Sequence, residues 1–138
     1  MPIQYSVTLR NNQLEQIETT TGASARLRLY SGSPPANCAA APTGTLLVDM
    51  ALPSDWMSAA SSGSKSRLGT WSGTGTAGAG SGTTAGYFRI VDSTGSTCHV
   101  QGTVTISGGG GDMTLDNPNI AQNQTVTVNT FTITAGNA

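Results

Sequence analysis

The start of the chain carries apolar and small residues at the three- and four-residue spacing of an amphipathic helix, from position 6 to position 21. The stripe runs through Val7, Arg10, Leu14, Ile17 and Thr21. Glu15 and Glu18 are expected on the opposite, solvent-facing side, and Gly22 stands where a C-terminal cap belongs. Because several residues in this stretch are poor helix formers, an extended segment over residues 3–9 is the alternative.

The rest of the chain alternates apolar and polar residues in short runs, which is typical of β-strands separated by turns. The clearest run, 25–30, has the inward set Ala25, Leu27 and Leu29 and the outward set Arg26, Arg28 and Tyr30. Segments 87–92 and 97–106 flank a Ser/Thr/Gly turn and predict a hairpin. Further strands are expected at 45–52, 65–71, 113–115 and 125–135. The last of these should contain a β-bulge at Asn129-Thr130, where its apolar residues change face.

This pattern predicts a mainly β protein, a jelly roll or β-sandwich of six to eight antiparallel strands after one N-terminal helix. The length of 138 residues fits a single domain over residues 1–138. One stretch, 73–86, contains only Gly, Thr, Ala and Ser, and we expect it to form a mobile surface loop.

The amino-acid composition excludes several classes of binding partner. Only 9% of the residues are charged, the net charge is −1, and there is a single histidine. Because nucleic-acid binding needs clustered Lys and Arg, no nucleic acid is expected as a partner. The sequence has neither a membrane-length apolar run nor a secretory signal pattern, so we expect no membrane partner and a protein made and retained in a cytoplasm, or exported only inside something larger. A reducing cytoplasm favours free thiols at Cys38 and Cys98, with a disulfide as the alternative.

Short motifs for chemistry lack their required context. Gly73–Gly78 matches a dinucleotide-binding pattern but has no strand before it and no helix after it. Ser62–Lys65 matches a serine acyl-enzyme pattern without its companion motifs. Cys98 and His99 are adjacent on a strand, so their side chains point to opposite faces. Turn formation, rather than metal binding, is the expected role of Asp92, Asp112 and Asp116. The sequence therefore predicts no catalytic residue, no cofactor and no metal.

Two surfaces are candidates for binding a partner. Arg26, Arg28 and Tyr30 share one strand face and would suit carboxylates on another protein, although a solvated outer face is the simpler interpretation. Trp56 and Met57 lie in a loop and would serve either as an interface anchor or as part of the core. Arg10 on the predicted helix completes the candidate interface residues (Arg10, Arg26, Arg28, Tyr30, Trp56 and Met57).

Several segments resemble the capsid cement (decoration) proteins of tailed bacteriophages, a family that includes the cement protein of a Bordetella podovirus. The first set is GASARLRLYSG at 22–32, PANCAAA at 35–41 and GTLL at 44–47. The second set is FRIVD at 88–92, TCHVQGTV at 97–104, MTLDN at 113–117, QTVTV at 124–128 and FTIT at 131–134. The resemblance covers roughly residues 6–135 and involves structural motifs rather than catalytic ones.

The resemblance implies a dimeric jelly-roll protein on the outer capsid surface of a virion, where it bridges neighbouring major capsid proteins. Many copies on a repeating surface supply avidity, so each contact can be weak. The alternative is a tail or fibre component, or a jelly-roll carbohydrate-binding module for host attachment. An enzyme is the least supported class, since the chain has one histidine and no coherent catalytic set.

Overall fold

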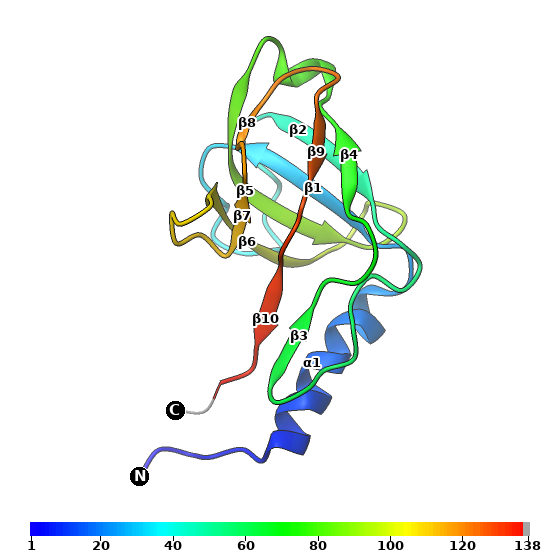
Figure 1. Ribbon diagram of the computed structural model, residues 1–138, viewed down its shortest axis with the longest axis vertical. Coiled ribbons are helices and arrows are strands. Elements are labelled where there is room, and N and C mark those ends of the chain that lie inside the picture. Colours follow the sequence, from blue (N-terminus) through cyan, green and yellow to red (C-terminus); the bar gives the residue numbers. More distant parts are fainter. Residues whose placement is uncertain (137–138) are drawn as a thin grey trace.

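The computed structural model describes residues 1–136 and shows a β-rich body from which one helix projects (Figure 1). Helix α1 spans Val7–Thr21. The Ser6 hydroxyl caps it by accepting a hydrogen bond from the backbone N–H of Leu9 at 3.1 Å. Gly22 ends it with a φ of 88°, a conformation that favours glycine. The predicted helix and its C-terminal cap are therefore confirmed, and the extended alternative is wrong.

The main sheet has the strand order β2-β1-β5-β6-β7, and β8 pairs with the start of β5. Its strands are β1 (Arg26–Ser31), β2 (Leu46–Ala51), β5 (Thr83–Val91), β6 (Cys98–Ile106), β7 (Met113–Leu115) and β8 (Asn119–Ile120). These strands pair antiparallel, except that β6 and β7 run parallel. The predicted hairpin is the β5–β6 pair, with Arg89 opposite Gln101.

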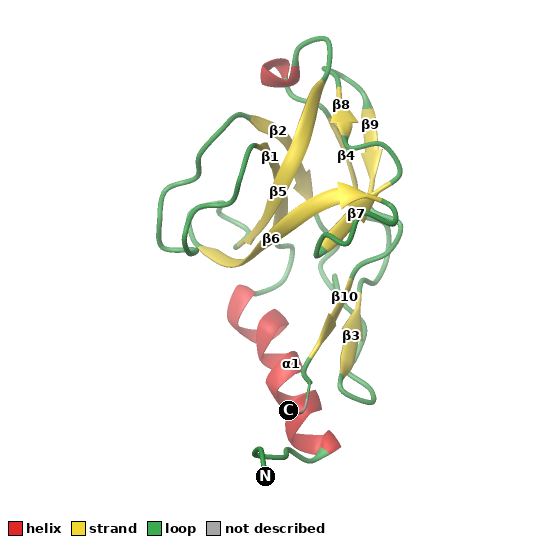
Figure 2. Cartoon of the chain, turned by 90° about the vertical axis from the view of Figure 1, so that its left-hand side faces the viewer, coloured by secondary structure: helices red, strands yellow, loops and turns green. Residues whose placement is uncertain are grey.

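Two short strand pairs complete the described chain. They are β4 (Ser72–Thr74) with β9 (Thr125–Thr127), and β3 (Ser64–Ser66) with β10 (Thr132–Thr134). Figure 2 shows β3 and β10 next to α1, below the main sheet. A mainly β fold with one N-terminal helix, consistent with a β-sandwich, is thus confirmed. Residues 1–136 hold ten strands rather than six to eight, and the strand expected at 65–71 is limited to β3.

The core lies against the inner face of the main sheet and is centred on two tryptophans. Trp56 and Trp71 are fully buried, and their ring centroids lie 6.0 Å apart. Phe131 packs against Trp71 with a centroid distance of 5.6 Å. Leu27 and Leu29 are completely buried, as the alternation along β1 predicts.

The glycine-rich stretch 73–86 is ordered structure, so the mobile loop expected there is wrong. It contains most of β4, the 3-10 turn η1 (Ala77–Ala79) and the start of β5. A Cβ atom at Gly75 would collide with the carbonyl oxygen of Ala121, and one at Gly86 with that of Gly32. These glycines allow two backbones to approach closely, a role that composition alone does not distinguish from flexibility.

The C-terminal segment 125–135 is not one strand with a bulge at Asn129-Thr130. It forms β9 and β10, which pair with different partners, β4 and β3. The connection places both Val128 and Phe131 in the core, with exposed fractions of 0% and 5%. The change of face in the sequence pattern therefore marks a break between two strands.

Candidate interaction surfaces

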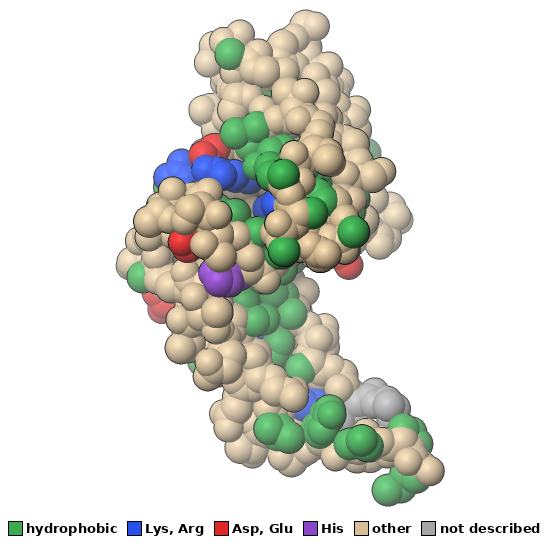
Figure 3. Space-filling model, turned by 180° about the vertical axis from the view of Figure 1, so that it is seen from behind, with side chains coloured by type: hydrophobic (Ala, Val, Ile, Leu, Met, Phe, Trp, Pro, Cys, Tyr) green, Lys and Arg blue, Asp and Glu red, His purple; other side chains and the backbone are tan. Residues whose placement is uncertain are grey.

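The outer face of the main sheet carries a row of polar residues from four neighbouring strands. Asp49 on β2 lies opposite Arg28 on β1. Arg28 also lies opposite Arg89 on β5, which in turn lies opposite Gln101 on β6. Arg26 is two positions before Arg28 and shares its face. We call these five residues the arginine row; Figure 3 shows Lys and Arg side chains (blue) gathered on this side of the molecule.

Asp49 holds the first two arginines of the row. Its carboxylate lies 2.8 Å from Nε of Arg26 and 3.3 Å from a terminal nitrogen of Arg28. The outward placement of both arginines is confirmed, but the predicted patch is partly neutralised by this carboxylate from β2. Tyr30 is only 6% exposed because it stacks on Tyr87 at a centroid distance of 5.0 Å. Tyr30 is therefore unavailable as a surface contact.

Arg89 differs from the other two arginines because it is only 4% exposed. One of its terminal nitrogens donates to the carbonyl oxygens of Asn37 and Ala40, at 3.2 and 2.8 Å. Its Nε has no hydrogen-bond partner, and within residues 1–136 no carboxylate pairs with it. The sequence analysis did not single out Arg89. The available signal was a charge inside the otherwise apolar run 87–91.

The loop over residues 32–45 covers part of the arginine row. Gln101 donates from Nε2 to the Pro35 carbonyl oxygen at 2.8 Å. Cys38 and Cys98 form a disulfide across a Cα–Cα distance of 5.3 Å, so the expectation of free thiols is wrong. The fold brings the loop onto the start of β6 and places the two cysteines within bridging distance, which a compartment argument cannot anticipate.

A hollow of about 180 Å³ remains between this loop and the row. Arg28, Arg89 and Ser96 line it together with Cys38, Cys98 and the alanines of the loop. Figure 3 shows a blue side chain lying inside this recess, between the blue patch and the green side chains of neighbouring segments. The outer face thus offers a small concave site with two guanidinium groups in its wall.

A second surface is apolar and lies at the free end of α1. Within the described residues, five of the seven large exposed hydrophobic side chains belong to the first nine positions. They are Met1, Ile3, Tyr5, Val7 and Leu9, with exposed fractions between 41% and 109%. We call this segment the apolar arm; it extends from the bottom of the molecule (Figures 1 and 3). The sequence analysis placed Val7 in a buried stripe, which is wrong because the helix projects beyond the body.

The other predicted interface residues serve internal contacts. Trp56 and Met57 are 0% and 1% exposed, so they form core and cannot anchor a partner. Trp56 donates from Nε1 to the carbonyl oxygen of Gly22 and thereby joins the loop to the end of α1. Arg10 donates to the carbonyl oxygen of Ala135 at 3.1 Å, which ties α1 to the segment after β10.

Lys65 on β3 links the helix to the strand pair β3–β10. Its side chain is fully buried, and its ammonium lies 2.9 Å from Glu15 and 2.8 Å from Glu18. It also donates to the Ser58 carbonyl oxygen at 2.8 Å. We call Lys65, Glu15 and Glu18 the lysine latch. The expectation that both glutamates point away from the fold is wrong, because each pairs with Lys65 where the helix packs along β3, although the Glu15 side chain is still 41% exposed and that of Glu18 20%.

The contacts of the lysine latch shift the pKa values of Lys65 and Glu15. Burial alone would lower the pKa of Lys65, but hydrogen bonds to Glu18 and Glu15 raise that pKa above its usual value. The pKa of Glu15 is lowered because the backbone N–H of Ala60 and then the Lys65 ammonium donate to its carboxylate. Both shifts favour the charged pair, so the latch is ionic at neutral pH.

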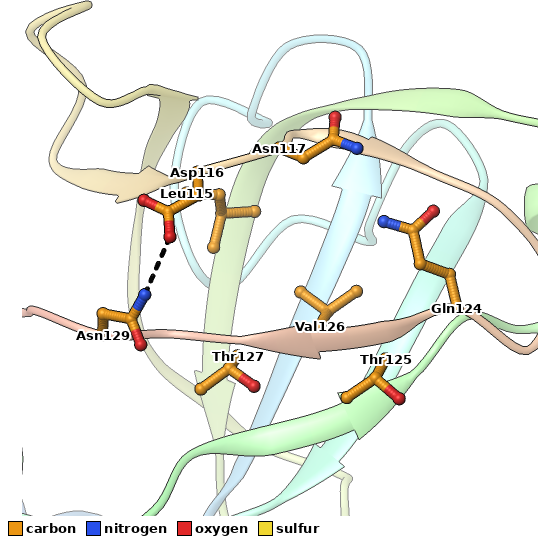
Figure 4. Close-up of a pocket in the computed structure, with 8 residues that line it drawn as sticks. All are labelled: Leu115, Asp116, Asn117, Gln124, Thr125, Val126, Thr127 and Asn129. Atoms are coloured by element: carbon orange, nitrogen blue, oxygen red, sulfur yellow. Dashed lines mark hydrogen bonds between the residues drawn. The ribbon is translucent and has the colours of Figure 1, made fainter.

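A polar pocket of about 210 Å³ lies between the end of β7 and β9 (Figure 4). Asn129 donates to Asp116 at 3.0 Å across its mouth, while Leu115 and Val126 are buried beneath. Asp112 accepts from the backbone and hydroxyl of Thr103. Asp112 and Asp116 therefore join segments that are distant in the sequence, and the expected turn-forming role is seen at Asp92, which accepts from the backbone N–H groups of Ser96 and Thr97.

The described residues contain no cluster of three or more His, Cys, Asp or Glu that could hold a metal ion. Over the same range, no helix has the length and apolar character needed to cross a membrane. No protein-family model, curated protein or solved structure matches this chain.

Proposed function

We propose that this protein is a virion structural protein that binds the outer surface of an icosahedral phage capsid and cements neighbouring major capsid proteins. The observation that carries the proposal is the apolar arm. Apolar side chains are usually buried in a monomer, and contiguous exposed ones mark interaction surfaces. Here they gather on the segment before α1 and on the first turn of that helix, where they can reach a neighbouring protein without rearrangement of the β body.

Cementing also requires a second contact, because one protein must join two subunits. The arginine row supplies it on a different part of the molecule from the apolar arm (Figure 3). One surface is apolar and the other is cationic, so each would select a different region of the shell. Many copies on a repeating lattice would then add their weak contacts into firm attachment.

The burial of the aromatic side chains gives less support to a carbohydrate-binding role. Sugar-binding sites usually display aromatic rings beside acidic residues. Of the seven aromatic side chains in the sequence, all but Tyr5 are buried. Trp71, which directly precedes the strand β4, is 0% exposed and belongs to the core.

Co-sedimentation with empty shells of the same virus tests the proposal. We expect the unmodified protein to pellet with shells and the Ile3→Ser/Leu9→Ser variant to bind about tenfold or more weakly, since each buried side chain contributes roughly 1.5–3 kcal/mol. The matched control is Leu68→Ser/Ile106→Ser, which removes two apolar side chains exposed elsewhere. Failure of the unmodified protein to pellet, or equal losses in both variants, would contradict the proposal.

A further inference from the structure

We propose that the hollow beside the arginine row is a binding site for the carboxylate of an acidic side chain on a partner protein. The identity of that partner as the capsid rests on the proposed function, whereas the chemistry of the site does not. The inference starts from Arg89, whose guanidinium is buried without a carboxylate partner among residues 1–136.

A buried cation of this kind is costly unless its charge is compensated. A lysine in such a place can lose its proton, but a guanidinium keeps its charge at every pH that a protein tolerates. Two carbonyl oxygens accept from one terminal nitrogen of Arg89, yet its Nε–H has no acceptor. The Nε–H of Arg28, the cross-strand neighbour, has none either.

The carboxylates on this side of the molecule are already engaged. Asp49 pairs with Arg26 and Arg28. Asp92 accepts hydrogen bonds from residues 94, 96 and 97 of its own turn, which lower the pKa of its carboxyl group although burial opposes the shift. Neither forms an ion pair with Arg89. The compensating anion for Arg89 must therefore come from another molecule.

The hollow fits a carboxylate on a short aliphatic stem. Its volume is about 180 Å³, and its walls combine the two guanidinium groups with Ala39, Ala40, Ala41 and Pro42. Guanidinium groups recognise planar carboxylates through paired N–H donors. The small apolar walls would pack against the methylene groups of Asp or Glu. The carbonyl oxygens of Asn37 and Ala40 beside Arg89 favour a singly charged ligand over a phosphate with nearly two charges.

Side-chain NMR of the arginine Nε–H groups tests the site without any capsid. The probe is the α-amide of N-acetylglutamate, and its neutral glutamine counterpart and inorganic phosphate serve as comparison arms. We expect the Arg28 and Arg89 signals to shift saturably with the glutamate probe only, while the Arg67 signal stays in place. Arg28→Gln should weaken the probe's binding about tenfold, and Arg67→Gln, which removes a charge away from the row, should leave it unchanged.

Several outcomes would overturn the inference. One is the absence of any shift at probe concentrations up to about 100 mM, where even weak specific sites fill. A second is an equal shift at Arg67, which would indicate general charge attraction. A third is binding of phosphate without binding of the glutamate probe. Because these readouts use the isolated protein, a failure here is separate from a failure to bind shells.

Discussion

Among residues 1–136 two cations are buried, Lys65 and Arg89, and their surroundings differ. Lys65 lies between α1 and β3, where its ammonium group contacts the carboxylates of two glutamates and a backbone carbonyl oxygen. Arg89 lies on the outer face of the sheet, where it donates hydrogen bonds to carbonyl oxygens while its Nε has no partner. The first site is complete within one chain, and the second is not.

This difference distinguishes a contact that stabilises the fold from a site that is available to bind another molecule. A satisfied buried ion pair fixes the position of one element against another, and here it holds α1 against β3. An uncompensated buried cation does not fix one element of the isolated fold against another. Its pairing with an anion from another molecule, however, favours binding of that molecule. We therefore assign the lysine latch to stability and the arginine row to binding.

Removal of the lysine charge should have the largest effect on stability. Lys65→Met leaves Glu15 and Glu18 together without their cation, and we expect a loss of about 2–4 kcal/mol, less than for a fully buried pair because the glutamates are partly exposed. Urea unfolding measures this loss. The Glu15→Gln/Glu18→Gln/Lys65→Met variant should recover part of it, and an unchanged midpoint in Lys65→Met would refute the latch.

The matched substitution on the outer sheet face, Arg89→Met, should lower the free energy of unfolding by less than Lys65→Met does. Arg89→Met breaks no ion pair, so we expect a loss of about 1 kcal/mol or less in the same urea experiment. At ten times its dissociation constant, the glutamate probe should stabilise the unmodified protein by about 1.4 kcal/mol. It should not stabilise Arg89→Met. Equal losses in the lysine and arginine variants would erase the contrast between the two sites.

Acidification should produce the smallest effect, at the latch and, through the lowered pKa of Asp92, at the β5–β6 turn. Because the folded-state pKa of Glu15 is lowered, its stabilising contribution is present above the ordinary value of 4.5 and is lost as pH falls through the lowered pKa. The raised pKa of Lys65 places its own loss at alkaline pH, above the ordinary value of 10.5. Hydrogen exchange should show α1 opening more readily at pH 3 than at pH 7, by less than about 1 kcal/mol given the exposure of Glu15. Greater loosening in β1, which lies away from both Glu15 and Asp92 in the sequence, than in α1 would argue against this assignment.

The sequence predicts the elements well where side chains alternate or repeat. The helix, β1 and the β5–β6 hairpin follow directly from spacing, as does the outward placement of Arg26 and Arg28. The spacing of residues along the chain cannot show which distant residue lies opposite a given position on a neighbouring strand or helix. Asp49 and Arg89 join the row only through strand register, and Lys65 meets the glutamates only because α1 packs along β3.

Other errors have a physical origin of the same kind. The glycine-rich stretch shows no alternation in its sequence because its glycines carry no side chains; Gly75 and Gly86 instead stand where two backbones approach closely. Val7 of the apolar arm was expected in the helix stripe with Leu14 and Ile17, since the sequence does not reveal where a helix leaves the body. Trp56 shows that an aromatic residue in a loop segment can be the centre of the core.

A cryo-EM map of shells decorated with this protein tests the central claim most directly. The account predicts density on the outer capsid surface into which the structure fits with the apolar arm against one capsid subunit. It further predicts an acidic side chain of a neighbouring subunit at Arg28 and Arg89. Undecorated shells, or density in which both the arm and the arginine row face solvent, would contradict the account.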